Sequence, residues 1–126
     1  MDYQRVEGGR EYVGRLEHGG DWRGQIETFA EAEGIDAAFF ISLGAASNAT
    51  LLFYDKSELE YHSVEFDEPL EVTTAIGNIS HLGDERFAHV HATLSRPDGT
   101  MIGGHLDSAT VFAGELHVRE FDTHLE

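Results

Sequence analysis

The sequence contains no cysteine, only two prolines and a single lysine, Lys56. Without cysteine there are no disulfide bonds, no thiolate catalysis and no cysteine-ligated zinc, so any metal must be bound by histidine, carboxylate or water. No apolar run approaches the roughly 20 residues of a membrane span, and no signal peptide is apparent. We therefore expect a cytoplasmic protein, with residues 1–126 forming a single domain around one core.

Positive charge is also scarce. Eight basic residues stand against 24 acidic ones, which gives a net charge of −16, and the acidic residues are spread along the whole chain. Phosphate binding requires clustered lysine and arginine, so direct nucleic-acid binding by this chain is not expected. Repulsion among so many carboxylates is screened at high salt, where the Debye length falls to about 3 Å at 1 M. The composition is thus typical of a halophilic protein, the alternative being an ordinary acidic protein.

One segment has the periodicity of an amphipathic helix. Asp21 is a suitable N-cap, Gly34 is a suitable C-terminal stop, and between them Trp22, Ile26 and Ala30 recur at helical spacing. The rest of the chain predicts strands at 11–17, 37–46, 50–54, 60–66, 70–79, 86–95, 100–106 and 110–121.

These elements predict an α+β fold, with a curved, mostly antiparallel sheet of about seven strands and one helix packed on it. The segment 37–46 is apolar on both faces and needs cover on each side. The helix covers one side. Curling of the sheet or a second subunit would cover the other, which is one reason to expect an oligomer.

Three of the eight histidines are arranged informatively. His89 and His91 point to the same face of a predicted strand whose opposite face is apolar. The sequence Pro-Asp-Gly at 97–99 is a strong turn signal. If these three residues form the loop of a hairpin, His91 lies opposite His105 and His89 lies opposite Asp107. A loop of two or four residues would instead turn His105 to the other face.

Three converging imidazoles form a candidate metal site. They suit zinc first, and also nickel, iron or copper, and they leave a coordination position open for water or a ligand. Asp107 is a candidate fourth ligand, or an acceptor that orients one imidazole. The alternative is a set of polar residues on a hydrated face. The other histidines are expected at the surface, although His81 could approach the site from its turn: His18, His62, His81, His117 and His124.

Other catalytic patterns are missing. No serine lies in a Gly-x-Ser-x-Gly context, and no glycine cluster has the spacing of a phosphate-binding loop. Acidic pairs such as Glu58/Glu60 are most simply solvated surface residues. The histidine group is therefore the main chemical feature of the sequence.

Three sequence blocks resemble the PPC (plants and prokaryotes conserved) domain, also catalogued as a domain of unknown function. They are residues 34–51, 69–80 and 89–106, the last with His-x-His, Asp-Gly and Gly-Gly-His. The resemblance implies one helix against a curved antiparallel sheet, assembled as a homotrimer. It also implies that His89, His91 and His105 occupy positions that hold a metal in some prokaryotic members.

The resemblance implies a DNA-associated or regulatory function as well. That label comes largely from plant members that carry a separate AT-hook, which this chain lacks. We therefore expect a metal-binding homotrimer that acts through protein or ligand contacts. The alternative is a metal-dependent enzyme that uses the open position on a three-histidine metal, which a nearby general base such as Asp107, Glu85 or Asp84 would favour.

Overall fold

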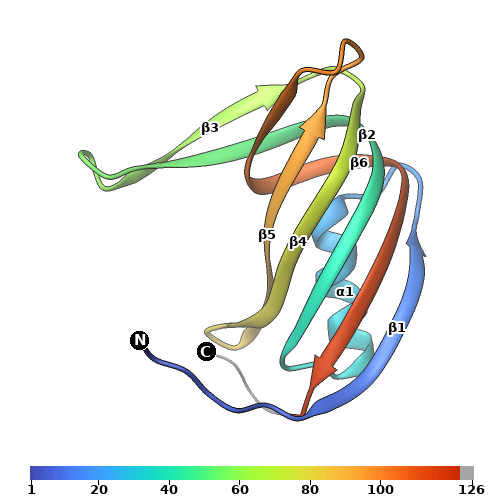
Figure 1. Ribbon diagram of the computed structural model, residues 1–126, viewed down its shortest axis with the longest axis vertical. Coiled ribbons are helices and arrows are strands. Elements are labelled where there is room, and N and C mark those ends of the chain that lie inside the picture. The colour runs from blue at the N-terminus through green and yellow to red at the C-terminus, as the bar shows by residue number, and fades with distance from the viewer. Residues whose placement is uncertain (123–126) are drawn as a thin grey trace.

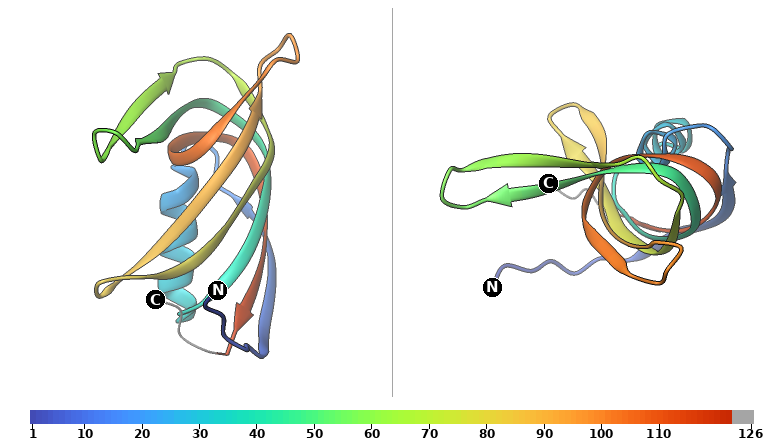
Figure 2. Two further views of the ribbon diagram at one scale, coloured as in Figure 1. Left: turned by 60° about the vertical axis from the view of Figure 1, so that its left-hand side comes forward. Right: turned by 90° about the horizontal axis from the view of Figure 1, so that it is seen from above.

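The computed structural model describes residues 1–122, which form six antiparallel strands and one helix. The strand order is β1-β6-β5-β4-β2-β3, and β6 also pairs with β2, so that the sheet closes on itself. Figure 2 shows the resulting ring of strands from above. In chain order the elements are β1 (Gly8–Leu16), α1 (Trp22–Glu33), β2 (Ala38–Asp55), β3 (Glu60–Phe66), β4 (Leu70–Leu82), β5 (Glu85–Ser95) and β6 (Met101–Phe121) (Figure 1).

The predicted α+β architecture is confirmed, with six strands in place of about seven. The segments predicted at 37–46 and 50–54 belong to one strand, β2, and those at 100–106 and 110–121 belong to β6. Register shifts in the β2–β6 ladder, at Ala45/Ala46, Ala46/Asn48 and Thr50/Leu51, bend these long strands without ending them. Curling of the sheet thus covers the inner face of β2, whereas its outer face stays exposed at Phe39, Ile41 and Leu43.

Helix α1 begins and ends where the sequence predicts. The Asp21 carboxylate accepts a hydrogen bond from the Gly24 amide at 2.7 Å, and Gly34 adopts the left-handed conformation with φ 66°. Trp22, Ile26 and Ala30 are fully buried. The helix contacts both β5 and β6. These two strands pair with each other only from Met101 to His105 of β6, and beyond His105 they diverge. Helix α1 covers the opening that this divergence leaves.

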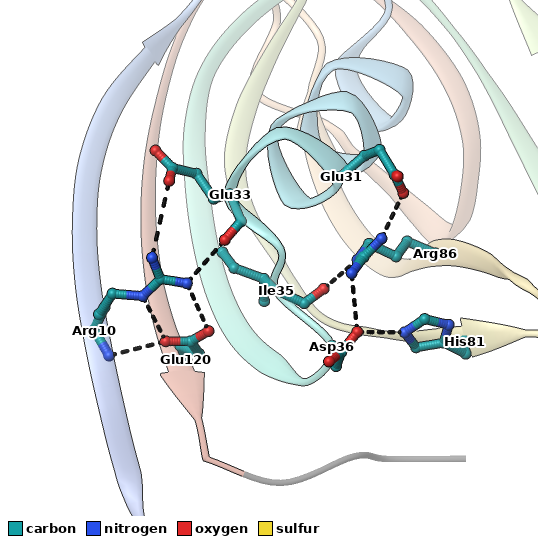
Figure 3. Close-up of polar contacts among 8 residues, drawn as sticks. All are labelled: Arg10, Glu31, Glu33, Ile35, Asp36, His81, Arg86 and Glu120. Carbon is teal, nitrogen blue, oxygen red and sulfur yellow. Dashed lines mark hydrogen bonds and ion pairs between the residues drawn. The ribbon is translucent and has the colours of Figure 1, made fainter.

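Two arginines hold the C-terminal end of α1 (Figure 3). Arg10 donates to the Glu33 carbonyl at 2.8 Å and forms an ion pair with Glu120 at 2.9 Å. Arg86 donates to the Ile35 carbonyl just beyond the helix. The last carbonyls of a helix lack hydrogen-bond partners within the helix. The arginine side chains donate to carbonyls at this end of the chain segment, and so they attach α1 to β1, β5 and β6.

The inner face of the barrel forms the core, and part of the outer face is apolar and exposed. Alternate residues of β5, from Ala88 through Val90 and Ala92 to Leu94, point inward and are buried. On the outer face, four side chains from β2 and β4 are 46–52% exposed. We call these four residues the outer patch: Phe39, Ile41, Leu43 and Ile76. Within residues 1–122, no helix has the length and apolarity that crossing a bilayer would require.

Candidate metal centre

The β5–β6 hairpin brings His91 and His105 together. The Arg96 amide donates to the Thr100 carbonyl at 2.9 Å, so that residues 97–99 form the loop. The ladder below this loop places His91 directly opposite His105, as the turn signal predicts. His89 lies two residues before His91 on the same face of β5 and directly opposite Asn78 of β4.

The three imidazoles converge closely enough to share one ion. One ring nitrogen from each of His89, His91 and His105 lies within 4.8 Å of the other two. The ring centroids are 5.1 Å apart for His89–His91, 5.1 Å for His89–His105 and 5.4 Å for His91–His105. Tetrahedral zinc with bonds of about 2.0–2.1 Å needs ligand nitrogens about 3.3 Å apart. Small side-chain rotations on a fixed backbone would therefore satisfy zinc.

Partial burial favours the neutral form of two of these rings. Desolvation, and then the charge of His91, lower the pKa of His89. Desolvation also lowers the pKa of His105, with His89, His91 and Arg23 acting in the same direction and Asp107 opposing them. Because only a neutral imidazole can coordinate a metal, these effects favour binding at neutral pH.

Asp107 does not lie opposite His89, so this part of the sequence-based register was wrong. The β5–β6 ladder ends at the His91–His105 pair, and β6 then turns to pair with β2, where His105 faces Leu52. Gly104, with φ 151°, allows the bend at this point. The carboxylate of Asp107 lies 3.9 Å from Arg23 of α1 and is not part of the histidine group.

Two side chains near the three histidines, Tyr61 and Arg23, were not predicted from the sequence. The Tyr61 ring of β3 lies 5.8 Å from the His105 ring and 5.0 Å from the Tyr54 ring of β2. Arg23 stacks at 4.9 Å over Phe87, which precedes His89 on the same face of β5. Neither contact has a signal in local spacing, because each joins elements that are distant in the sequence.

The other described histidines make separate contacts. His81 lies 2.9 Å from an Asp36 oxygen, beside Arg86 (Figure 3). It does not belong to the group formed by His89, His91 and His105. The remaining three are exposed: His18 contacts the Phe112 carbonyl at 2.9 Å, His117 contacts Glu11 at 3.3 Å, and His62 lies 3.4 Å from both Asp55 and Glu58. His124 lies outside the described residues.

His62 belongs to a second group of candidate ligands, at the exposed turn between β2 and β3. Its ring nitrogen and oxygens of Asp55 and Glu58 lie within 4.8 Å of one another. One oxygen of Asp55 already accepts bonds from the amides of Ser57 and Glu58 and from the Ser57 hydroxyl. We interpret this group as a solvated turn, and the three-histidine group remains the candidate metal centre.

Together the fold and the histidines define a class: a small antiparallel barrel closed by one helix, with three converging imidazoles on its outer surface. The chain belongs to the Plants and Prokaryotes Conserved (PCC) domain family, the PPC domain of the sequence analysis, whose model matches residues 3–122. Among curated proteins, no sequence match was found.

Solved structures extend the comparison. A metal-containing protein from Archaeoglobus fulgidus is 39% identical, with a TM-score of 0.94 over 98% of this chain and 88% of that one. A PPC protein from Pyrococcus horikoshii is 28% identical, with a TM-score of 0.94 over 98% and 87%. A protein from Bacteroides thetaiotaomicron with a provisional DNA-binding name is 25% identical, with a TM-score of 0.86 over 94% and 86%.

Proposed function

We propose that this protein is a homotrimeric metal-binding member of the PCC family that acts in regulation through protein or ligand contacts. The observation that carries the proposal is the convergence of His89, His91 and His105, with ligand nitrogens within 4.8 Å of one another. The 39%-identical relative from Archaeoglobus fulgidus is named as metal-containing, which supports a metal here. Zinc is the ion we propose, because three neutral imidazoles are typical zinc ligands.

The surroundings of the three imidazoles suit the binding of a further ligand. A zinc ion with three protein ligands keeps one position for water or an external donor. Tyr61, which is 57% exposed, places an aromatic ring 5.8 Å from the ring of His105. A small ligand bound at the open position would therefore contact both the metal and β3.

The outer patch supports self-association. Phe39, Ile41 and Ile76 are about half exposed and lie on adjacent strands, with Ile41 directly opposite Ile76. Contiguous exposed apolar surface on a domain of this size commonly marks an interface. A trimer would bury this surface, in agreement with the assembly that the family resemblance implies.

Direct DNA binding is less well supported than regulation through other contacts. Two relatives, from Bacteroides thetaiotaomicron and Ralstonia eutropha, carry provisional DNA-binding names. The net charge of −16 opposes phosphate contacts, and five arginines are already paired with carboxylates: Arg5, Arg10, Arg23, Arg86 and Arg96.

A metal-dependent enzyme is the second candidate function, favoured by the open coordination position. Such an enzyme commonly needs a general base next to the metal. Within residues 1–122, no carboxylate joins the histidine group, and Asp107 is directed toward Arg23. We therefore place metal-dependent binding before metal-dependent catalysis.

Elemental analysis of the purified protein tests the proposal. We expect about one zinc per chain in the wild type and almost none in His91→Ala, because two imidazoles hold zinc weakly. His18→Ala, which removes an exposed histidine outside the group, is the matched control and should retain the metal. Unchanged metal content in His91→Ala would refute the site, and a native mass other than three chains would refute the trimer.

A further inference from the structure

The three imidazoles of the candidate metal centre need acceptors for the ring nitrogens that do not bind the ion. A metal-bound histidine almost always donates its second ring N–H to a carboxylate, a carbonyl or water, which fixes the tautomer and the orientation of the ring. Within residues 1–122, none of the three rings forms a hydrogen bond. The rings of His18 and His81, by contrast, are both hydrogen-bonded. Asp107, the acceptor that the sequence predicts, lies 3.9 Å from Arg23 instead.

Two of the three histidines face aliphatic side chains across the sheet. Ile76 of β4 lies directly opposite His91. Leu52 of β2 lies directly opposite His105. An aliphatic side chain accepts no hydrogen bond, so water or a bound ligand has to serve these two rings.

The third histidine, His89, faces a polar side chain, that of Asn78. The two residues are directly paired in the β4–β5 ladder, and both are half-buried. Within residues 1–122 the side chain of Asn78 forms no hydrogen bond, whereas the side-chain oxygen of Asn48 accepts one from the Thr110 amide at 3.3 Å. A polar group that is partly removed from water gains from a partner in the protein. Asn78 thus has a free acceptor beside a ring that needs one.

The pairing of β4 with β5 puts Asn78 and His89 within reach of each other. Residues directly opposite one another on a sheet have Cβ atoms about 4.5–5.5 Å apart. The side-chain oxygen of asparagine and the Nδ1 of histidine each lie two bonds beyond Cβ, so rotation of the two side chains brings these atoms to a hydrogen-bonding distance of about 2.9 Å. On the other side of Asn78, Phe39 of β2 offers no competing group, and its ring packs against that of Phe121 at 5.8 Å.

We propose that Asn78 positions His89 for metal binding: its side-chain oxygen accepts a hydrogen bond from the Nδ1–H of His89, which directs Nε2 of the ring to the metal. This inference rests on the proposed function, since it concerns the same metal centre. Asn78 contacts the ring and not the ion, so it is a positioning residue. Loss of such a partner commonly lowers metal affinity by about 10–100-fold.

The first experiment determines the tautomer of His89 in the zinc-loaded wild type. Long-range ¹H–¹⁵N correlation spectra of ¹⁵N-labelled protein distinguish the two ring nitrogens of each histidine. We expect the proton of the His89 ring on Nδ1, with slow exchange against water because it is hydrogen-bonded. A zinc-bound His89 ring that carries its proton on Nε2 would overturn the inference, and this result depends on no variant.

The second experiment compares zinc affinities by competition with a chromogenic chelator. Asn78→Leu keeps the size of the side chain and removes the acceptor, and we expect it to bind zinc at least tenfold more weakly than the wild type. Asn78→Asp keeps an acceptor oxygen and removes the amide donor, and it should bind zinc at least as tightly as the wild type. An Asn78→Asp protein as weak as Asn78→Leu would overturn the inference, because the N–H of the amide would then be the group that matters.

Ser80→Ala is the matched control. Ser80 lies two residues beyond Asn78 on the same face of β4, and the residue opposite it is Phe87 in place of a histidine. The control should leave zinc affinity unchanged. Circular dichroism and native mass establish that each variant keeps the fold and the assembly of the wild type.

The outcomes separate this inference from the proposed function. A wild type that binds no zinc refutes the metal site and the role of Asn78 together. A wild type that binds zinc, with an Asn78→Leu protein of equal affinity, refutes the role of Asn78 alone and leaves the metal site intact. Weaker binding in Asn78→Leu that is restored in Asn78→Asp supports both.

Discussion

The indole nitrogen of Trp22 donates a hydrogen bond to the hydroxyl of Ser42 at 3.1 Å, inside the core. Ser42 in turn donates to the Glu115 carbonyl at 2.6 Å, so that one buried hydroxyl connects α1, β2 and β6. Both side chains are almost fully buried, and Ser42 is the polar residue in a core that is otherwise apolar over residues 1–122. This connection fixes the start of the helix against the closed side of the barrel.

We expect Ser42→Ala to destabilise the protein by about 1–3 kcal/mol, because it leaves the buried indole N–H without an acceptor. The measurement is urea denaturation at one fixed protein concentration, since assembly contributes to the apparent stability. Ser63→Ala, at an exposed position of β3, is the control and should change the midpoint little. Equal midpoints for the two variants would show that the Trp22–Ser42 bond contributes nothing.

Substitution of Gly77 is expected to lower both the stability of the fold and the affinity of the metal centre for zinc. A Cβ at this position would overlap the His89 carbonyl oxygen and lie 2.7 Å from the Phe40 ring. We expect Gly77→Ala to cost about 3 kcal/mol through overpacking and, by displacing His89, to lower zinc affinity. Gly14→Ala, where no atom lies within 4 Å of the added carbon, should be tolerated. A Gly77→Ala protein with the stability of the wild type would contradict the close packing of β4 on β5.

The pair formed by Arg10 and Glu120 predicts a pH dependence of stability. The hydrogen bond from Arg10 lowers the pKa of Glu120. The ionised carboxylate is thus favoured in the folded state, and its contribution is present above the ordinary glutamate pKa of about 4.3 and lost as the pH falls through the lowered value. We expect Glu120→Gln to be less stable than the wild type at pH 7 and to approach it below about pH 4.

The control for that comparison is Glu65→Gln, an exposed glutamate on β3. Its unfolding midpoint relative to the wild type should change little between pH 7 and pH 3. If the difference between the wild type and Glu120→Gln were the same at both pH values, the ionised pair would not be the cause of the effect.

The net charge of −16 predicts that salt stabilises this protein. Repulsion among carboxylates weakens as the Debye length falls from about 10 Å at 0.1 M to about 3 Å at 1 M. We expect the urea midpoint to rise steadily with potassium chloride up to about 2 M, well beyond the range in which ordinary surface pairs are screened. Urea is the suitable denaturant because it is uncharged. A midpoint that is flat or falls with salt would argue against a halophilic adaptation.

Local sequence patterns determined much of the candidate site. The two-residue alternation of β5 places His89 and His91 on one face, and the Pro-Asp-Gly loop at 97–99 places His105 opposite His91. Asp21 and Gly34 likewise determined the ends of α1. Each of these features depends on residues within a few positions of one another, where backbone geometry leaves few alternatives.

Only the tertiary structure decided what surrounds the three histidines. The bend at Gly104 turns β6 from β5 to β2, which separates Asp107 from His89 and brings Tyr61 beside His105. The pairing of β4 with both β2 and β5 also aligned Ile41 and Ile76 with His91 in one row. Periodicity determines which face a side chain occupies. The pairing of distant strands depends on how the whole chain buries its apolar surface, and no short segment contains that information.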